Sequence, residues 1–410
     1  MKTTWLYAVF AVASTLAWQA KAQIYDTNND YVQTFAGSGF SGHVDGVGQL
    51  TMFDNPNAIV ADSAGNLFVL DDNDYLVRKI TPDGTVSTFA GGGNEMTGNG
   101  TNATVYYGSS SIAIDQSNTL WIVGFNGFLV RVGSDTSVSE IFLSGTTYPW
   151  GACVDSSNNV YISDYGGNKI YRYNTNGILT VFAGSGNSGY ADGNGIFTAF
   201  AAPTALACDQ ANNIYVWDSA NYLIRRIDQN QNVTTLAGKF RIGSNADGIG
   251  TNASFASIYT MCADNSGNLY LACGQCIRKI SATTNVVTMA GSFTQSGYTN
   301  GAGDMAEFNG AEGVCITGGT IFVADSQNEL IRDITFNPQP QVVSGANLDI
   351  GTFAGVTITG SVGRAYQVQS SPDNTNWTTQ ATLVLTSSPY LWIDQNPVSG
   401  NKFYRAVMLP

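Results

Sequence analysis

Short hydrophobic runs separated by glycine and asparagine recur along most of the chain. In one stretch, 57–91, the runs 58–61, 67–70, 76–80 and 86–89 are rich in β-branched and aromatic residues. Runs of this length and composition predict β-strands, and the Gly and Asn residues between them predict tight turns. The pattern therefore predicts a unit of three or four short strands.

This unit occurs six times. The residue that closes its first run recurs at intervals of 53, 40, 54, 55 and 53 residues, and an arginine follows 14–17 residues later. The closing residues are Asp62, Asp115, Asp155, Asp209, Asp264 and Thr317, and the arginines are Arg78, Arg131, Arg172, Arg225, Arg278 and Arg332. The interval of 40 residues indicates a bare unit, and the longer intervals indicate an insertion. Six such units predict an all-β fold of the β-propeller type, with six blades.

The two ends of the repeated region indicate how the ring closes. Residues 32–37, VQTFAG, match the fourth run of a unit but precede the first complete unit, and the sixth unit ends near Ile334 without a fourth run. We therefore expect strand 32–36 to complete the sixth blade, which closes the ring and protects its sheet edges. The segment 352–356, TFAGV, is an alternative, but it lies 20 residues beyond the last arginine, where the first unit has 8.

Two motifs carry a resemblance to a known family. They are P-x-A-I-V-A-D…G-N-L-F-V-x-D…V-R-K-I at 56–80 and G-Y-A-D-G-N-G…F-x-x-P at 189–203. With them the chain resembles the NHL-repeat family of β-propellers over about residues 31–336. The resemblance implies the fold but no single activity, because such propellers include RNA-binding modules, lyases, sensor domains and extracellular binding proteins.

The first 22 residues have the pattern of a signal peptide. Lys2 precedes an apolar stretch at 5–17, and Ala20-Lys21-Ala22 forms an A-x-A-like cleavage site. We expect export to the periplasm or the exterior, with cleavage after Ala22. The stretch is too short to span a bilayer and no other long apolar run follows, so we expect no membrane span in the mature chain.

The repeat stops after the sixth unit. We expect the propeller domain to cover 23–336, a linker to cover 337–345, and a small β-sandwich to cover 346–410, where short β-rich runs recur. The pattern YQVQSSPDNTNW…FYRAV in this last segment resembles terminal modules of secreted bacterial proteins with immunoglobulin- or fibronectin-III-like folds.

Composition and charge narrow the possible functions. The formal charge of the 410 residues is −13, and Asp, Glu, Lys and Arg together make up only 11%. The negative balance argues against nucleic acid as a partner, because phosphate binding needs clustered Lys and Arg. The chain has one histidine, His43, which excludes a His-rich zinc site and disfavours a His-based catalytic triad.

Two sets of repeated aspartates are candidate ligand-binding residues. One set ends the second strand of a unit, and the other opens the A-D-G-x-G motif of the insertion. The first set is Asp71, Asp164, Asp218 and Asp325, and the second is Asp45, Asp192 and Asp247, with Asn300 in the fourth copy. Loops of both kinds are expected on one face of the propeller, near its channel. The alternative is structural: hydrogen bonding within turns, with the aromatic that follows each A-D-G motif filling the gap between blades. These aromatics are Phe53, Phe200, Phe255 and Phe308. The repeated arginines are likewise expected to bond one blade to the next.

Carboxylates at Asp71 and Asp164 would also suit calcium, so the expected cofactor is either none or calcium. Among the cysteines, Cys273 and Cys276 flank a two-residue turn and predict a hairpin disulfide in an oxidising compartment. The other four cysteines fall on first strands, where buried free thiols are expected. They are Cys153, Cys208, Cys262 and Cys315.

These features favour an exported binding or interaction propeller. Its ligand or partner, a protein, peptide or glycan of the envelope or the exterior, would lie on the face formed by the second-strand ends and the A-D-G loops. The alternative is a calcium-dependent propeller enzyme of the lactonase or lyase type, acting at the mouth of the channel. Enzyme activity is the less favoured of the two, because no carboxylate pair has a spacing that marks it for acid–base work.

Overall fold

The computed structural model describes residues 30–92, 98–99, 109–336, 355–358, 365–371, 375–384, 390–393 and 403–408. The chain divides into two compact units, Met1–Gln339 and Pro340–Pro410. The predicted signal peptide and linker lie outside the described residues. Within the described ranges, no helix is both long and apolar enough to cross a membrane.

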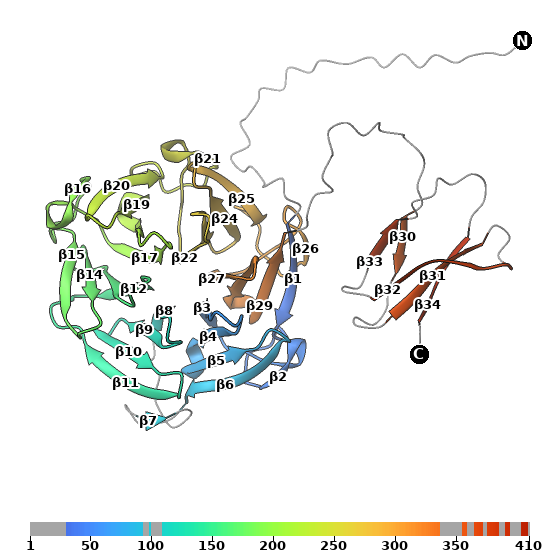
Figure 1. The fold of residues 1–410 in the computed structure, drawn as a ribbon. Coiled ribbons are helices and arrows are strands. Elements are labelled where there is room, and N and C mark those ends of the chain that lie inside the picture. The colour runs from blue at the N-terminus through green and yellow to red at the C-terminus, as the bar shows by residue number, and fades with distance from the viewer. Residues whose placement is uncertain are drawn as a thin grey trace, which may run out of the picture. The chain divides into compact units, whose positions relative to one another are not determined.

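The first unit is built from six antiparallel sheets of four or five strands, arranged around a central axis (Figure 1). The strands of the first three sheets are β2 (Gly46–Val47), β3 (Pro56–Ala61), β4 (Leu67–Asp71), β5 (Leu76–Ile80), β6 (Thr85–Gly91), β7 (Gly98–Asn99), β8 (Ser109–Ile114), β9 (Leu120–Gly124), β10 (Phe128–Val132), β11 (Ser137–Phe142), β12 (Pro149–Val154), β13 (Val160–Asp164), β14 (Lys169–Tyr173) and β15 (Leu179–Ala183). Those of the other three are β16 (Gly193–Asn194), β17 (Pro203–Cys208), β18 (Ile214–Asp218), β19 (Leu223–Ile227), β20 (Asn232–Ala237), β21 (Gly248–Ile249), β22 (Thr260–Ala263), β23 (Leu269–Ala272), β24 (Cys276–Ile280), β25 (Asn285–Gly291), β26 (Gly301–Ala302), β27 (Ala311–Thr317), β28 (Thr320–Asp325), β29 (Leu330–Thr335) and β1 (Tyr31–Ala36).

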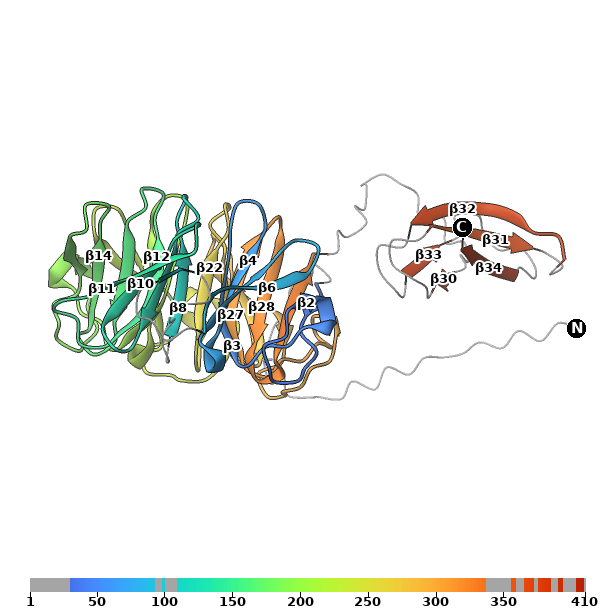
Figure 2. The same cartoon turned by 90° about the horizontal axis from the view of Figure 1, so that it is seen from below.

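The innermost strands β3, β8, β12, β17, β22 and β27 surround the axis, and the later strands of each unit lie progressively outward (Figure 1). The strands run across the thickness of the ring, so their turns gather on two opposite faces (Figure 2). The all-β prediction and the propeller-type arrangement are confirmed. The third sheet, which lacks the insertion, has four strands, whereas each of the others gains a short fifth strand from it or from the corresponding segment.

The N-terminal strand lies in the same sheet as the end of the repeated region. β1 pairs antiparallel with β29, with Val32 opposite Ile334 and Thr34 opposite Arg332, and it also pairs with β26. The expected pairing of strand 32–36 is therefore present. In the competing segment, residues 352–354 lie outside the described ranges, and the strand that follows, β30 (Gly355–Ile358), pairs within the second unit.

Hydrophobic side chains fill the space between neighbouring sheets. Six clusters of buried residues are present in the described ranges, and each one joins two adjacent sheets. One of them brings Ala36 and Ile331 of the last sheet against Ile59 and Val69 of the first. The apolar faces of every sheet are thus covered by its neighbours, which is how the repeated pattern is buried.

The closing aspartate of each first strand organises the turn that follows it. Asp62 accepts hydrogen bonds from the backbone N–H groups of Ala64 and Asn66, at 3.0 and 2.8 Å, and from the Asn66 side chain at 2.7 Å. The same bonds to the second and fourth following residues form at Asp115, Asp155 and Asp264. These carboxylates satisfy turn donors, which is the structural role expected of an Asp that precedes Gly or Asn.

The six repeated arginines fall at two different positions of their strands. Four of them are fully buried and pair with an apolar residue of the preceding strand: Arg78 with Val69, Arg225 with Val216, Arg278 with Leu271 and Arg332 with Val323. Arg131 and Arg172 lie one position further along and are only half-buried. A shift of one residue turns a side chain to the other face of its strand. The inward positions in those two sheets are taken by Val130 and Tyr171.

The second unit contains two antiparallel sheets. The strand β30 pairs with β33 (Tyr390–Ile393), and β31 (Ala365–Ser371) pairs with β32 (Thr378–Val384) and β34 (Phe403–Met408). Tyr366 and Val368 of β31 are buried. These pairings confirm β-structure in this segment, and the sandwich stays a prediction.

Candidate functional site

The second-strand and A-D-G aspartates meet at the four inward arginines. Arg78 donates to Asp71 at 2.8 Å and to Asp45 at 2.7 Å. Arg225 repeats this arrangement with Asp218 at 2.9 Å and Asp192 at 2.6 Å. Each A-D-G loop is therefore fastened to the second strand of its sheet through a shared guanidinium group.

The remaining two copies vary this arrangement. Arg332 donates to Asp325 at 2.8 Å and to Asn300 at 2.7 Å. Arg278 donates twice to the A-D-G aspartate Asp247, at 3.0 and 2.7 Å, and Cys273 stands where the other copies have the second-strand aspartate. In all four copies the guanidinium lies over the ring of the phenylalanine that follows the A-D-G motif, 4.4–5.4 Å from its centroid. These four rings are fully buried, as expected of aromatic side chains that fill the gaps between blades.

The second-strand aspartates are consequently buried inside the ring rather than offered to a ligand. Asp71, Asp164, Asp218 and Asp325 have no exposed surface. Burial raises the pKa of Asp71, Asp218 and Asp325, because loss of hydration outweighs the arginine next to each. Asp164 lacks an arginine and instead accepts three backbone N–H bonds, from Thr147, Tyr148 and Gly167. Of the A-D-G set, Asp45 and Asp192 keep about half of their side-chain surface exposed.

These contacts bear on the calcium expectation. Asp71 uses one carboxylate oxygen for the Asp54 N–H and the other for Arg78, and Asp164 is occupied as described above. Among the described residues, no three His, Cys, Asp or Glu side chains are grouped so that they could hold a metal ion. The described residues therefore show no set of calcium ligands around Asp71 and Asp164, and calcium binding there stays a prediction.

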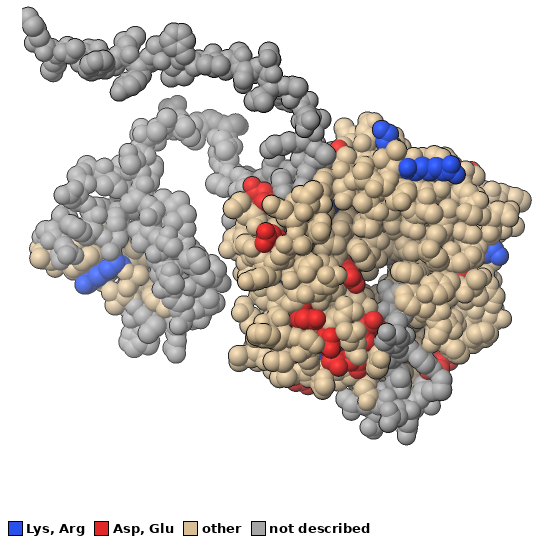
Figure 3. Space-filling view, turned by 180° about the vertical axis from the view of Figure 1, so that it is seen from behind, with Lys and Arg blue, Asp and Glu red and all other residues tan. Residues whose placement is uncertain are grey.

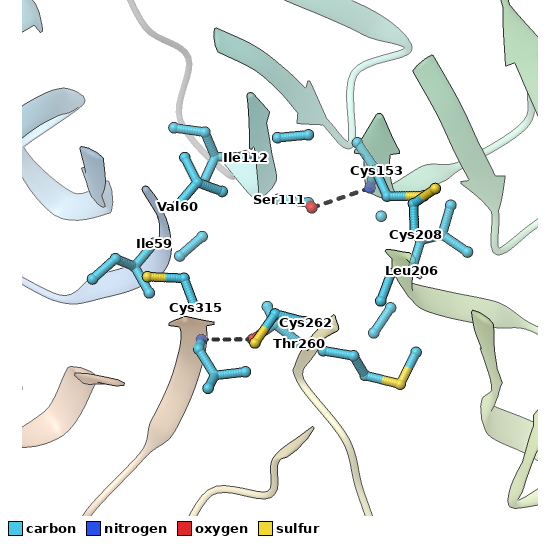
Figure 4. A pocket seen from close by; sticks show the side chains of 18 of the residues that line it. Ile59, Val60, Ser111, Ile112, Cys153, Leu206, Cys208, Thr260, Cys262 and Cys315 are labelled. Carbon is cyan, nitrogen blue, oxygen red and sulfur yellow. Dashed lines mark hydrogen bonds between the residues drawn. The ribbon is translucent and has the colours of Figure 1, made fainter. Parts of the chain in front are cut away.

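A channel lined largely by small apolar side chains runs along the axis of the ring. Its walls come from the six innermost strands and enclose a cavity of about 200 Å³. Ile59, Val60, Ile112 and Leu206 line it together with thiols, and Figure 4 shows these side chains arranged around an open centre. Four cysteines occupy the positions predicted for them, at Cys153, Cys208, Cys262 and Cys315. Burial raises the pKa of all four thiols, so they stay protonated and weakly reactive.

A second cavity of about 180 Å³ lies at the mouth of this channel. It is lined by Asn57, Asp72, Phe125, Trp150, Tyr259, Thr260 and Glu312. Trp150, Tyr259 and Thr260 also line the channel, so the two cavities adjoin. We call the cavity formed by these seven residues the mouth pocket. It opens on the face that carries the second-strand ends, the face expected to bind ligand.

Six of the seven lining residues occupy two positions of the repeat. Asn57, Trp150, Tyr259 and Glu312 each stand five residues before the residue that closes the first strand. Asp72 and Phe125 each stand ten residues after it, directly behind the second strand. At both positions the chemistry changes from unit to unit, whereas the Asp and Arg described above recur. The signal that could have identified the pocket was thus internal variation at a fixed repeat position.

Aromatic rings form one wall of the mouth pocket. Phe125 stacks on Tyr148 with centroids 5.1 Å apart and planes at 9°, and it also contacts Trp150 at 4.7 Å. Trp150 in turn contacts Tyr165 at 5.5 Å. Because each ring is held by others, the wall presents a pre-formed apolar surface, which suits ligand binding.

The lining of the pocket also includes carboxylates. Asp72 and Glu312 line it, and Asp54, Asp74 and Glu329 lie close enough to affect neighbouring carboxylates. Figure 3 shows acidic side chains gathered on one side of the central opening, with the visible Lys and Arg residues at the outer edge of this face. Burial is the main cause that raises the pKa of Glu312, from its ordinary 4.5 to about 7, and the nearby charge of Asp72 adds to it.

The raised pKa of Glu312 predicts how stability depends on pH. Because the folded protein binds this proton more tightly than the unfolded chain, the stabilisation from it is present at low pH and is lost as the pH rises from about 4.5 to about 7. Glu312→Gln removes the charge, so it should raise the free energy of unfolding at pH 8 relative to the wild type by about 1–2 kcal/mol, after discounting for partial exposure. At pH 5 the variant and wild type should agree. Urea unfolding at both pH values measures this, and an equal difference at the two would contradict it.

The other end of the channel is also hollowed, but its lining is different. Asp62, Asp115, Asp155 and Asp209 surround it with Ser, Gln and Asn residues of the adjoining turns. These carboxylates accept hydrogen bonds within their own turns, as described above. This end therefore repeats one structural device, whereas the mouth pocket brings together residues of different chemistry.

The predicted hairpin disulfide is not formed in the structure. Cys273 and Cys276 are free and buried, on either side of a two-residue turn in which the Cys273 N–H donates to the Cys276 carbonyl at 3.0 Å. Their side chains are hydrogen-bonded, and this bond is the main cause that lowers the pKa of Cys273 and raises that of Cys276. The two sulfurs are thus brought together as expected, and their oxidation stays a prediction.

Comparison with known proteins supports the NHL repeat and the propeller fold. A family model described as NHL repeat matches residues 146–172. The chain is 28% identical over 319 residues to Protein SUPPRESSOR OF QUENCHING 1, chloroplastic, of Arabidopsis thaliana, covering 73% of this chain and 27% of that protein. It therefore spans less than a third of the length of this curated relative.

Solved structures share the fold at low identity. A protein of unknown function from Bacteroides thetaiotaomicron has a TM-score of 0.60 and 20% identity, over 75% of this chain and 76% of that one. An auxiliary nutrient binding protein from the same organism has a TM-score of 0.58 and 18% identity, over 74% and 76%. A gluconolactonase of Xanthomonas campestris has a TM-score of 0.52 and 11% identity, over 77% and 94%.

Proposed function

We propose that the protein is an exported binding propeller, with the six sheets as the blades of a closed ring and with its ligand in the mouth pocket. The observation that carries the proposal is the convergence of the variable repeat positions on one cavity. Trp150, Tyr259 and Glu312 are equivalent in the repeat yet chemically different, and they share the lining of this pocket.

Residues that recur in the repeat and residues that vary in it have different structural roles. Residues that recur in most sheets, such as the Asp71–Arg78 pair, are buried and hold loops to strands. Residues that differ between sheets are partly exposed around the mouth pocket. A ring of equivalent positions that each carry a different side chain can match an asymmetric ligand, whereas identical side chains could not.

Export is part of this proposal and rests on the pattern of residues 1–22, which predicts a signal peptide. The partner would then be a protein, peptide or glycan of the envelope or the exterior. The auxiliary nutrient binding protein of Bacteroides thetaiotaomicron supplies a precedent for binding by a protein of this fold.

The proposal is tested by screening the full mature chain against arrays of envelope glycans and peptides. Each retained compound is then titrated by calorimetry against wild type, Trp150→Ala and Gln116→Ala. Trp150 lines the mouth pocket, whereas Gln116 lines the opposite end of the channel. We expect Trp150→Ala to weaken binding about tenfold or more, because it removes a stacking surface worth more than 1 kcal/mol.

The matched variant Gln116→Ala should leave the affinity unchanged. Binding that depends on Gln116 and not on Trp150 would place the ligand at the other end of the channel. If no glycan or peptide is retained by the wild type, the proposed class of partner is wrong.

A further inference from the structure

Resting on the binding function proposed above, we propose that the part of the partner bound here is an amphiphilic organic cation, whose ammonium group lies in the mouth pocket and whose aliphatic part enters the channel. The inference uses the chemistry of the two adjoining cavities together. One offers aromatic faces and carboxylates, and the other is a tube lined mostly by apolar side chains.

The aromatic wall suits a cationic group. Phe125, Trp150 and Tyr259 line the mouth pocket, and the first two contact each other at 4.7 Å. An ammonium group within about 6 Å of a ring centroid is attracted by the negative face of the ring, with Trp the strongest partner. The same chain already uses such contacts, since each inward arginine lies over a phenylalanine ring.

The charge around the pocket also favours a cation. Glu312 and Asp72 line it directly, and Asp54, Asp74 and Glu329 add to the negative charge on the same face. The visible Lys and Arg residues lie away from the opening (Figure 3). An anionic ligand would be repelled here, and an ammonium group would be paired with a partly buried carboxylate, where charge pairing is stronger than in water.

The channel below the pocket favours an aliphatic group as the remaining part of the ligand. Its wall is made mainly of Ala, Val, Ile, Leu and Met side chains and protonated thiols, with the hydroxyl groups of Ser111 and Thr260 among them (Figure 4). Trp150 and Tyr259 line both the channel and the mouth pocket. A hydroxyl-rich chain would find few side-chain hydrogen-bond partners in such a tube, and each group left unpaired would cost about 1–3 kcal/mol. An alkyl chain gains from the same burial, by about 0.8 kcal/mol per methylene.

Binding of a cation should depend on pH through Glu312. Two titratable groups face it: Asp72, on the turn after β4, and Tyr259, just before β22. The Ser326 side chain, just after β28, forms a hydrogen bond with it. Because burial raises the pKa of Glu312 to about 7, the carboxylate is largely protonated at pH 6 and ionised at pH 8. A cation pairs with the ionised form, so its affinity should increase across this interval.

The test uses four small probes and the full mature chain. At pH 8, n-hexylammonium, methylammonium, 1-hexanol and hexanoate are titrated by calorimetry into wild type, Glu312→Gln and Glu140→Gln. Glu140 is a half-buried carboxylate on β11, outside both cavities, and serves as the matched control. We expect n-hexylammonium to bind about tenfold more tightly than each other probe, and about tenfold more weakly in Glu312→Gln.

Several results would overturn the inference. If 1-hexanol binds as tightly as n-hexylammonium, the site does not select a cation. If methylammonium binds as tightly as n-hexylammonium, the aliphatic part does not contribute. An unchanged affinity in Glu312→Gln would show that the cation binds elsewhere. The proposed function fails separately, if retained array compounds do not depend on Trp150. If they do depend on Trp150 but n-hexylammonium neither binds nor competes with them, binding at the mouth stands and only the ligand class is wrong.

Discussion

Replacing Arg78 with methionine should lower the free energy of unfolding by about 3–5 kcal/mol. The side chain is fully buried and is bonded to Asp71, to Asp45 and to the Met52 carbonyl. Methionine is apolar and fills a comparable space, so the loss comes chiefly from the Asp71 carboxylate, which is left buried without its cation. The measurement is the urea midpoint and slope of the full mature chain at pH 8.

The matched control is Arg131→Met, at the residue that the sequence pattern equates with Arg78. Arg131 lies on the other face of its strand and is half-buried. We expect this change to shift the free energy of unfolding by less than about 1 kcal/mol, as for most partly exposed substitutions. Equal losses in the two variants would show that the register difference between the sheets has no energetic consequence.

Replacing Gly37 with alanine should be as damaging as a change in the core of one sheet, although Gly37 lies just after the N-terminal strand. A Cβ at this position would lie 2.5 Å from the Glu329 carbonyl oxygen and 3.1 Å from the Leu330 Cα, both of them backbone atoms at the other end of the repeated region. The backbone φ of +99° adds strain for any L side chain. We expect a loss of about 3–5 kcal/mol, from left-handed strain and overpacking together.

Gly39→Ala separates the clash from the strain. Gly39 also has a positive φ, +80°, but a Cβ there would meet only the Asn328 carbonyl oxygen, at 3.7 Å. This control should lose about 1–2 kcal/mol, the strain alone. If both variants unfold at the same urea concentration, the N-terminal strand does not hold the last sheet in the way the pairing of β1 with β29 indicates.

Much of the fold could be predicted because its signals are local and repeated. A hydrophobic run followed by an Asp and a Gly or Asn predicts a strand and its turn without knowledge of distant contacts. The pairing of β1 with β29 was also accessible, since an extra fourth run at one end complemented a missing one at the other. The four buried phenylalanines followed from the same periodic reasoning.

The register of the arginines could not be predicted from spacing alone. Arg131 follows its closing aspartate by 16 residues, as Arg78 does. The turn between β9 and β10 has three residues, whereas that between β4 and β5 has four. One residue fewer in the turn moves Arg131 one place along its strand and onto the opposite face.

The candidate site was missed for a different reason. Repetition drew the sequence-based hypothesis to the recurring aspartates, which the structure shows as buried partners of arginine and of backbone N–H groups. Trp150 and Glu312 do not recur, so each looked like an isolated residue. Only their equivalent place near the start of the first strand of a unit, together with the geometry of the ring, brings them to one pocket.

The pairing of β1 with β29 also determines when folding of the last sheet can be completed during synthesis. The N-terminal strand is synthesised first, yet its partner follows only after about 300 further residues, which takes roughly 15–60 seconds at ordinary translation rates. Throughout that time the nascent chain carries a strand with unpaired edges, and such edges promote association between chains. The pairing of β1 with β29 is therefore a late event of high contact order.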